Sequence, residues 1–233
     1  MQSQQTHQFF DQAQAAEYDN RFAKLAPIRD ALHLLISAIF ADLPEDARIL
    51  CVGAGTGSEI LHLAGKFPKW RFTAVEPSGP MLDVCRRRTG EAGLSTRCEY
   101  HEGYLDSLPP SEPFDAATSL LVSHFILSTQ DRTEYFRTIA SRVIPGGLLA
   151  NAELASDPTA PSYDSLMHVW LRLLAGADLS EEKIAQMRAA YQKDVAILPL
   201  SQVAGIIATG GFETPVQFLQ TGLIHGWYAK RGH

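Results

Sequence analysis

Three glycines at alternate positions, Gly53, Gly55 and Gly57, separate an apolar stretch of strand type from the start of a helical pattern. A strand that turns abruptly into a helix needs residues that tolerate a positive φ and lack a Cβ where another group comes close. The helix that follows offers backbone N–H groups and the positive end of its dipole. This arrangement suits a ligand with a polar, partly anionic portion, such as a nucleotide, although an ordinary tight turn uses the same residues.

A candidate partner for these glycines is Glu76, which ends a second strand-like stretch over residues 72–76. A carboxylate at this distance along the chain can accept hydrogen bonds from both ribose hydroxyls of an adenosine. The glycines and the acid together predict an adenosine-containing ligand. The spacing is G-x-G-x-G instead of G-x-G-x-x-G, which disfavours a nicotinamide-dependent dehydrogenase.

Four stretches in this order resemble the motifs of the class I S-adenosylmethionine (SAM)-dependent methyltransferases. ILCVGAGTGSEI (residues 49–60) looks like their motif I, and FTAVEPSGPML (72–82) looks like the acidic loop that follows it. The similarity continues through FDAATSLL (114–121) in the fourth strand and IPGGLL (144–149) at the turn into the fifth. Four motifs in the right order are far more specific than one.

The resemblance implies SAM as the cofactor and S-adenosylhomocysteine (SAH) as its product. One departure concerns the loop that lies along the adenine ring: the family's glycine–acid pair becomes Gly103-Tyr104 here, and an acid arrives only at Asp106. Backbone atoms of the loop are then the alternative contact. The cofactor-binding positions carried over from the family are Gly53, Ala54, Gly55, Gly57, Glu76, Pro77, Met81, Gly103, Tyr104, Leu105, Ser119, Leu120 and Leu121.

Two residues are candidates for catalysis, His124 and Tyr18. The sulfonium donor brings its own leaving group, so the protein mainly supplies alignment and a pocket. A base is needed only for an acceptor that must lose a proton, and His124, just beyond the fourth strand, could be that base or a helix-start histidine bonded to backbone. Tyr18 lies in an N-terminal helix that often covers SAM in similar enzymes, and it could equally be a tyrosine packed on the core.

Three further residues are candidate contacts for the acceptor. Arg21 could meet a carboxylate, and Glu153 is expected on the binding rim at the end of the fifth strand. Trp170 belongs to an apolar helix side, over residues 162–174, that is richer than a free surface helix requires. Substrate choice is expected in this helical layer, because the core fold does not determine it.

Composition favours one soluble globular domain, with 45% hydrophobic and 20% charged residues in 233. The net charge of −6 argues against a general nucleic-acid surface. The basic cluster Arg86-Arg87-Arg88 is expected to be a solvated helix face instead of a phosphate site. The three cysteines have no metal-ligand spacing, so we expect a reduced protein without a metal. The polar N-terminus and the lack of a membrane-length apolar run predict a cytoplasmic protein that does not enter a membrane.

The predicted fold is a three-layer α/β sandwich, with a Rossmann-like, seven-stranded, mostly parallel sheet, a C-terminal antiparallel hairpin and a helical lid. Helices broken near Pro27 form an N-terminal cap over residues 1–45. The expected SAM-binding core spans 46–155, the lid 156–198, and the last helix with the closing hairpin 199–233.

The predicted activity is methyl transfer from SAM to a small-molecule acceptor, with nucleic acid disfavoured as a substrate. The layout is also similar to the carboxy-SAM synthases used in tRNA modification, although their full set of arginines for a substrate carboxylate is not recognisable. A non-catalytic SAM-binding protein on the same fold is a third interpretation. The apolar lid helices and final strand also allow a homodimer.

Overall fold

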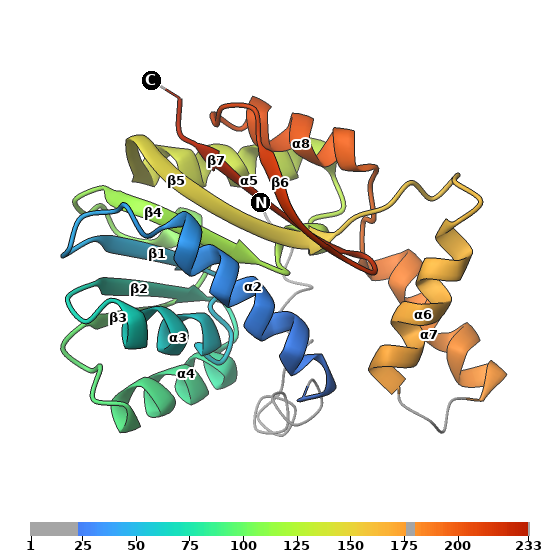
Figure 1. Ribbon diagram of the computed structural model, residues 1–233, viewed down its shortest axis with the longest axis horizontal. Helices are drawn as coiled ribbons and strands as arrows, with labels where there is room; N and C mark the ends of the chain where they lie inside the picture. Colours follow the sequence, from blue (N-terminus) through green and yellow to red (C-terminus); the bar gives the residue numbers. More distant parts are fainter. Residues whose placement is uncertain (1–22, 176–179, 233) are drawn as a thin grey trace.

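The computed structural model describes residues 23–175 and 180–232, in which seven strands form one sheet in the order β3-β2-β1-β4-β5-β7-β6 (Figure 1). Strands β1 to β5 run parallel, β7 is antiparallel to β5, and β6 is antiparallel to β7. The predicted mostly parallel sheet with a closing hairpin is therefore confirmed. The strands are β1 (Arg48–Val52), β2 (Arg71–Glu76), β3 (Cys98–Glu102), β4 (Phe114–Leu120), β5 (Val143–Leu154), β6 (Val216–Thr221) and β7 (Ile224–Lys230).

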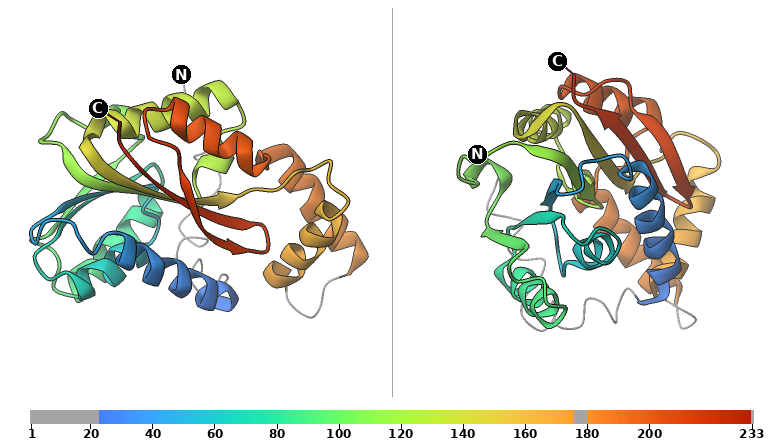
Figure 2. Two further views of the ribbon diagram at one scale, coloured as in Figure 1. Left: turned by 45° about the horizontal axis from the view of Figure 1, so that its top comes forward. Right: turned by 60° about the vertical axis from the view of Figure 1, so that its left-hand side comes forward.

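Helices cover both faces of this sheet, which confirms the three layers. Helices α2, α3 and α4 lie on one face and α5 and α8 on the other, while α6 and α7 lie beyond the carboxyl ends of the parallel strands (Figures 1 and 2). The helices are η2 (Ala23–Leu25), α2 (Ala26–Ile39), α3 (Ser58–Lys66), α4 (Gly79–Glu91), η3 (Leu105–Ser107), η4 (Ser123–Phe125), α5 (Thr129–Arg142), α6 (Tyr163–Ala175), α7 (Glu181–Asp194) and α8 (Leu200–Thr209).

Strand β1 illustrates how the sheet is buried between its two helical layers. Its residues Ile49 and Cys51 join the core under α2 and α3, whereas Leu50 and Val52 join the core under α5 and α8. Side chains alternate between the faces of a strand, so a strand covered on both sides needs a continuous apolar run. A third apolar cluster joins the end of β5 to α6.

Local signals set several element boundaries. Pro27 stands in the first turn of α2, where its missing N–H costs no helical hydrogen bond, and the predicted start of a helix near it is confirmed. The part of the predicted cap before residue 23 lies outside the described residues. The Ser78 hydroxyl accepts the Met81 N–H at 3.4 Å and caps α4, as the sequence predicts.

The predicted fifth strand begins later than the observed one: β5 starts at Val143, and its register against β4 shifts between Phe114 and Ala116. The expected turn into the strand is therefore an irregular first part of the strand itself.

No helix in the described part of the chain is long and apolar enough to cross a membrane. Within residues 23–175 and 180–232, His, Cys, Asp and Glu side chains form no group of three that could hold a metal ion.

Candidate functional site

A glycine loop joins β1 to α3 and lies at the carboxyl edge of the sheet. The N–H groups of Gly53 and Ala54 donate to the Val75 carbonyl of β2, at 2.8 and 3.1 Å. Gly53 has φ +72°, and a Cβ there would collide with the Val122 side chain. Gly57, at φ +77°, leads directly into α3, and a Cβ on it would come within 2.6 Å of the Cys85 sulfur. The loop therefore requires glycine for both its backbone conformation and its close packing.

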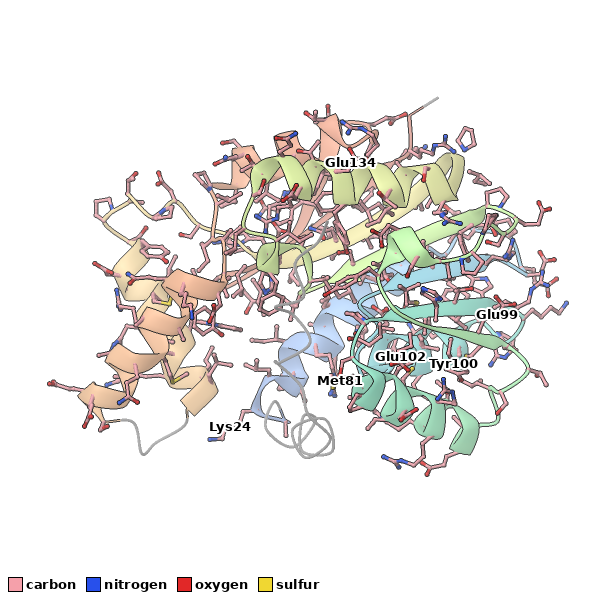
Figure 3. The ribbon with its side chains drawn as sticks, turned by 180° about the vertical axis from the view of Figure 1, so that it is seen from behind. Lys24, Met81, Glu99, Tyr100, Glu102 and Glu134 are labelled. Atoms are coloured by element: carbon pink, nitrogen blue, oxygen red, sulfur yellow. The ribbon has the colours of Figure 1, made fainter. Side chains whose placement is uncertain are left out.

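Glu76, at the end of β2, is bonded to this loop. Its Oε2 accepts the Gly55 N–H at 3.0 Å and its Oε1 accepts the Ser78 N–H at 2.9 Å. Burial raises the pKa of this carboxyl, and the two backbone hydrogen bonds act in the opposite direction. Met81, at the start of α4 (Figure 3), completes the group, because a Cβ on Gly55 would lie 3.5 Å from its methyl carbon. The structure thus brings together three of the predicted cofactor-binding residues.

The loop after β3 lies beside the end of β2. The Gly103 N–H donates to the Glu76 carbonyl at 3.1 Å, and Leu105 is buried while Tyr104 is half-buried. Glu102, the register partner of Glu76 on β3, was not identified from the sequence. A Cβ on Gly79 would lie 2.8 Å from its Oε1, so Glu102 adds a second acid close to the start of α4 (Figure 3). The position of Glu102 at the end of a predicted strand, where ligands bind in such sheets, could have identified it from the sequence.

The turn after β4 carries local backbone strain. Leu121 has φ +61°, and it is the one non-glycine residue with a positive φ in the part of the chain described. Its N–H donates to the Ala152 carbonyl at 2.6 Å. Such conformations cost about 1–3 kcal/mol and gather at functional sites. The Ser119 hydroxyl is hydrogen-bonded to the Tyr135 hydroxyl at 2.8 Å, so a ligand at this turn would meet the backbone of Ser119.

A buried carboxyl that the sequence did not single out, Glu59, lies in the first turn of α3. Its Oε1 accepts the Thr118 hydroxyl of β4 at 3.0 Å. Burial raises the pKa of Glu59 to about 7, against the opposing hydrogen bonds from Thr118 and Cys51. The acid therefore lies between α3, β1 and β4, directly behind the glycine loop, and its place among the apolar residues of α3 gave no clear signal of this.

A buried ion pair lies on the other side of the turn. Arg132 of α5 and Glu153 of β5 are 1% and 0% exposed, and their Nη2 and Oε2 atoms lie 3.1 Å apart. The Ser123 hydroxyl donates to the same carboxylate oxygen. Burial raises the pKa of Glu153, and Arg132 acts to lower it. Glu153 was expected on the binding rim, but its side chain is fully buried, and its contact with an acceptor stays a prediction.

His124 is held in the same region and is 3% exposed. Its Nδ1 accepts the Leu154 N–H at 3.4 Å, and its carbonyl accepts the Ala196 N–H at 2.8 Å. Burial, assisted by the charge of Arg132, lowers the pKa of His124 to about 3. An imidazole with this pKa is neutral and weakly basic at neutral pH. The general-base role stays a prediction, and the alternative of a histidine bonded to backbone matches these contacts.

Three predicted residues remain. Tyr18 and Arg21 fall outside the described residues. Trp170 is buried in the cluster that joins α6 to the end of β5, beside Met167 and Leu171. Its indole N–H has no hydrogen-bond partner among the described residues. Buried polar groups are normally satisfied, so this N–H stands out as an available donor.

Chemically, the carboxyl edge offers a close-packed glycine loop, a carboxylate at the adjoining strand and a strained turn beside both. This combination can hold a ligand that carries hydroxyl groups and a polar tail. Two described side chains at the turn, His124 and Glu153, are engaged in internal hydrogen bonds.

Comparison with known proteins gives consistent matches. A family profile described as a methyltransferase domain matches residues 49–147. The chain is 33% identical to a fatty-acid O-methyltransferase of Mycolicibacterium smegmatis, over 58% of this chain and 44% of that protein. It is 29% identical to a trans-aconitate 2-methyltransferase of Streptomyces coelicolor, over 72% and 52% of the two chains. The chain thus spans about half the length of these two relatives.

Two longer alignments extend the picture at lower identity. A carboxy-S-adenosyl-L-methionine synthase of Campylobacter lari is 22% identical over 88% of this chain and 86% of that protein. The solved structure of the CurJ carbon methyltransferase matches with a TM-score of 0.67 and 14% identity, over 96% of this chain and 62% of that one. At such identity, the structural match concerns the fold alone.

Proposed function

We propose that this chain, which belongs to the class I family of SAM-dependent methyltransferases, transfers a methyl group from SAM to a small-molecule acceptor. The observation that carries the proposal is the bond between the glycine loop and the acid, in which Glu76 accepts the Gly55 N–H at 3.0 Å. This bond sets a carboxylate and a glycine loop side by side at the carboxyl ends of adjacent parallel strands, where ligands bind in such sheets.

In this proposal Glu76 accepts hydrogen bonds from the ribose hydroxyls, and Met81 packs against the adenine. The glycine loop and the backbone of residues 119–121 hold the amino-acid part of the cofactor. SAM supplies an activated methyl group: the acceptor's lone pair forms the new bond while the electrons of the carbon–sulfur bond return to sulfur, which leaves neutral SAH. The remaining predicted cofactor contacts, at Pro77 and residues 103–105, line the same edge.

We further propose that the acceptor enters between the Leu121 turn and helices α6 and α7, with residues 156–198 acting as a lid. The two relatives named for their substrates act on a fatty acid and on trans-aconitate, both organic acids. A carboxylate is already ionised at neutral pH and needs no base before it attacks. An organic acid is therefore compatible with a site whose nearest histidine is buried and has a pKa of about 3.

Calorimetric titration of the full chain with SAH tests the cofactor site. Replacing the buried acid in Glu76→Ala removes an acceptor of charge-assisted hydrogen bonds, so we expect roughly 100-fold weaker binding. Glu91→Gln changes an exposed acid at the end of α4 and should bind as the parent does. Parent-like binding by Glu76→Ala would contradict the proposed site, and no binding by the parent would contradict the cofactor. Organic acids should then be screened for methyl esters by mass spectrometry.

A second candidate is the synthesis of a carboxylated SAM, which is favoured by the alignment with the Campylobacter lari synthase over 86% of its length. The two activities differ in the fate of the cofactor. Methyl transfer converts SAM into SAH, whereas a synthase converts SAM into a heavier derivative that keeps its sulfonium. Mass spectrometry of the cofactor after incubation with organic acids separates the two, and binding without either product would indicate a non-catalytic SAM-binding protein.

A further inference from the structure

The three consecutive arginines of α4 have different surroundings. Arg86 pairs with Asp83 and Arg87 pairs with Glu91, and all four side chains are more than half exposed. Arg88 points instead to the glycine loop. The expectation of a solvated basic face is therefore right for the first two arginines and wrong for the third.

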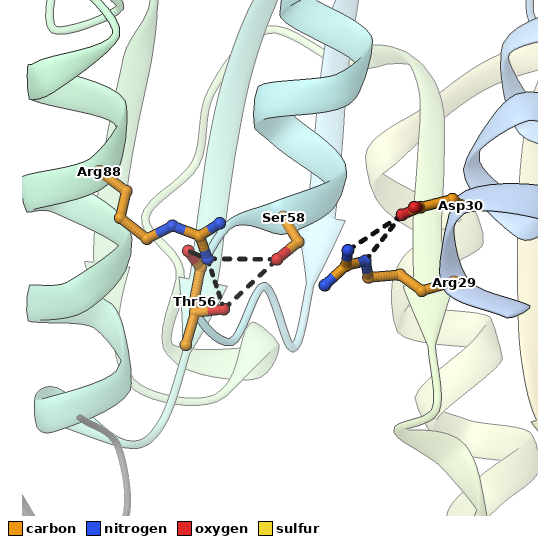
Figure 4. Close-up of polar contacts among 5 residues, drawn as sticks. All are labelled: Arg29, Asp30, Thr56, Ser58 and Arg88. Carbon is orange, nitrogen blue, oxygen red and sulfur yellow. Dashed lines mark hydrogen bonds and ion pairs between the residues drawn. The ribbon is translucent and has the colours of Figure 1, made fainter. Parts of the chain in front are cut away.

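Arg88 contacts the loop through one nitrogen that reaches three oxygens (Figure 4). Its Nη1 lies 3.1 Å from the Thr56 carbonyl, 2.9 Å from the Thr56 hydroxyl and 3.2 Å from the Ser58 hydroxyl. Thr56 is buried and stands between two glycines with positive φ. The contact thus holds the part of the loop in which the flanking glycines, Gly55 and Gly57, would otherwise allow many backbone conformations.

Arg88 is the last of three residues along α4 that meet this loop. Met81 lies next to Gly55, and the Cys85 sulfur lies next to Gly57. Residues four and seven positions apart share one face of a helix, so one face of α4 contacts the loop from Gly55 to Ser58. Glu76, just before this helix, bonds the Gly55 N–H. The part of the loop from Gly55 to Ser58 is therefore shaped by residues 76–88.

The shape of the Arg88 side chain suits a positioning role. Its guanidinium lies beside the N-terminus of α3, which begins at Ser58. A rigid, planar guanidinium can hold several oxygens in one fixed arrangement.

We propose that Arg88 is a positioning residue for the cofactor: it holds Thr56 and Ser58 so that the glycine loop already has its binding conformation when SAM arrives. The inference rests on the proposed function, because it concerns the same loop. A preorganised loop has less conformational freedom to lose on binding. Removing the Arg88 side chain should therefore weaken cofactor affinity more than it lowers the stability of the protein.

The test compares neighbouring arginines in the full chain, with SAH binding followed by calorimetry and thermal unfolding of the free protein measured alongside. Arg88→Met should weaken SAH binding about tenfold, the effect of one charge-assisted hydrogen bond, without a matching loss of melting temperature. Arg87→Met removes an exposed arginine one position away and should match the parent. Arg88→Lys keeps the charge but loses the planar donor group, so its affinity should be intermediate.

A double-variant comparison shows whether Arg88 acts through the loop. Thr56→Val removes the hydroxyl acceptor, and Arg88→Met should then add little to its effect on SAH binding. Additive losses, parent-like binding by Arg88→Met, or a loss of affinity that follows the loss of melting temperature would each overturn the inference while leaving the proposed function intact. A parent protein that does not bind SAH would instead overturn the proposed function.

Discussion

The glycine loop and the turn after β4 adjoin each other at the sheet edge but are stabilised in different ways. The loop is shaped by backbone hydrogen bonds, glycine conformations and polar contacts from residues 76–88. The turn at residues 121–124 is anchored by the fully buried pair of Arg132 and Glu153 and by His124. Changes near the loop should therefore affect binding first, and changes beneath the turn should affect stability first.

The buried pair also connects the turn to the end of the α6–α7 segment. Arg132 donates to the Ala196 carbonyl at 3.3 Å, and the Ala196 N–H donates to the His124 carbonyl. The two ends of the segment are in turn joined to each other, because the Ser156 N–H donates to the Leu198 carbonyl at 3.0 Å. The segment proposed as a lid is thus tied to the turn where it returns to the core.

The largest expected effect comes from Arg132→Met, which leaves the Glu153 carboxylate buried and unpaired. We expect the free energy of unfolding in urea to fall by about 3–5 kcal/mol. Arg137→Met, on the same helix, breaks an exposed pair with Glu134 and should cost at most about 1 kcal/mol. Adding Glu153→Leu to Arg132→Met removes the unpaired charge and should restore most of the stability. Equal losses from the two arginine variants would contradict the contrast between the regions.

The stability of the loop region should depend on pH, because Glu59 behind the loop has a pKa of about 7, above its usual value of 4.5. The folded state holds the proton more tightly than the unfolded state, so the contribution is full below pH 4.5 and is lost as pH rises through 7. Glu59→Gln mimics the protonated acid and keeps the acceptor for Thr118. We expect the free energy of unfolding of this variant, measured in urea, to rise by roughly 3 kcal/mol relative to that of the parent as the pH increases from 4.5 to 8. If the difference between variant and parent were the same at both ends of this range, the pKa assigned to Glu59 would be wrong.

The neighbouring His33 should give a pH dependence of opposite sign. It is buried between α2 and α3, and burial first, then His62 and Arg29, lower its pKa from 6.5 to about 4. The unfolded state therefore binds the proton more tightly, so this contribution is full above pH 6.5 and is lost as pH falls through 4. His33→Gln should remove roughly 3 kcal/mol of the parent's acid sensitivity in that window. His168→Gln, on α6, is the control, and an equal effect from both variants would contradict the prediction.

The sequence predicted the elements better than it predicted the direction of charged side chains. Strands at residues 71–76 and 114–120 agree to within one residue with the stretches 72–76 and 114–121 identified in the sequence, because apolar runs between turn residues specify them locally. Arg88 was expected on a solvated face and Glu153 on the binding rim, yet both have internal partners. A charged residue on a regular element looks accessible in the sequence, and only the packing of a distant segment, the loop for Arg88 and α5 for Glu153, shows that it is engaged.

The last prediction concerns the place where the two regions touch, and it divides into two smaller parts. A Cβ on Gly53 would collide with Val122 of the turn, so Gly53→Ala should suffer overpacking as well as the strain of a positive φ. Val122→Ala makes room for the added methyl group and should recover the overpacking part, about 1–3 kcal/mol.

The residual loss should be the backbone term alone, about 1–2 kcal/mol, because no side-chain change at position 122 alters φ at Gly53. A cycle of the parent, both single variants and the double variant, measured by urea unfolding, gives the coupling energy directly. Gly93→Ala is a suitable control, since it has a similar positive φ of +74° with no atom within 4 Å of the added Cβ. It should show the backbone term only. A coupling energy near zero would mean that the loop and the turn relax independently of each other. Cofactor binding at the loop would then not need to affect the proposed acceptor side of the turn.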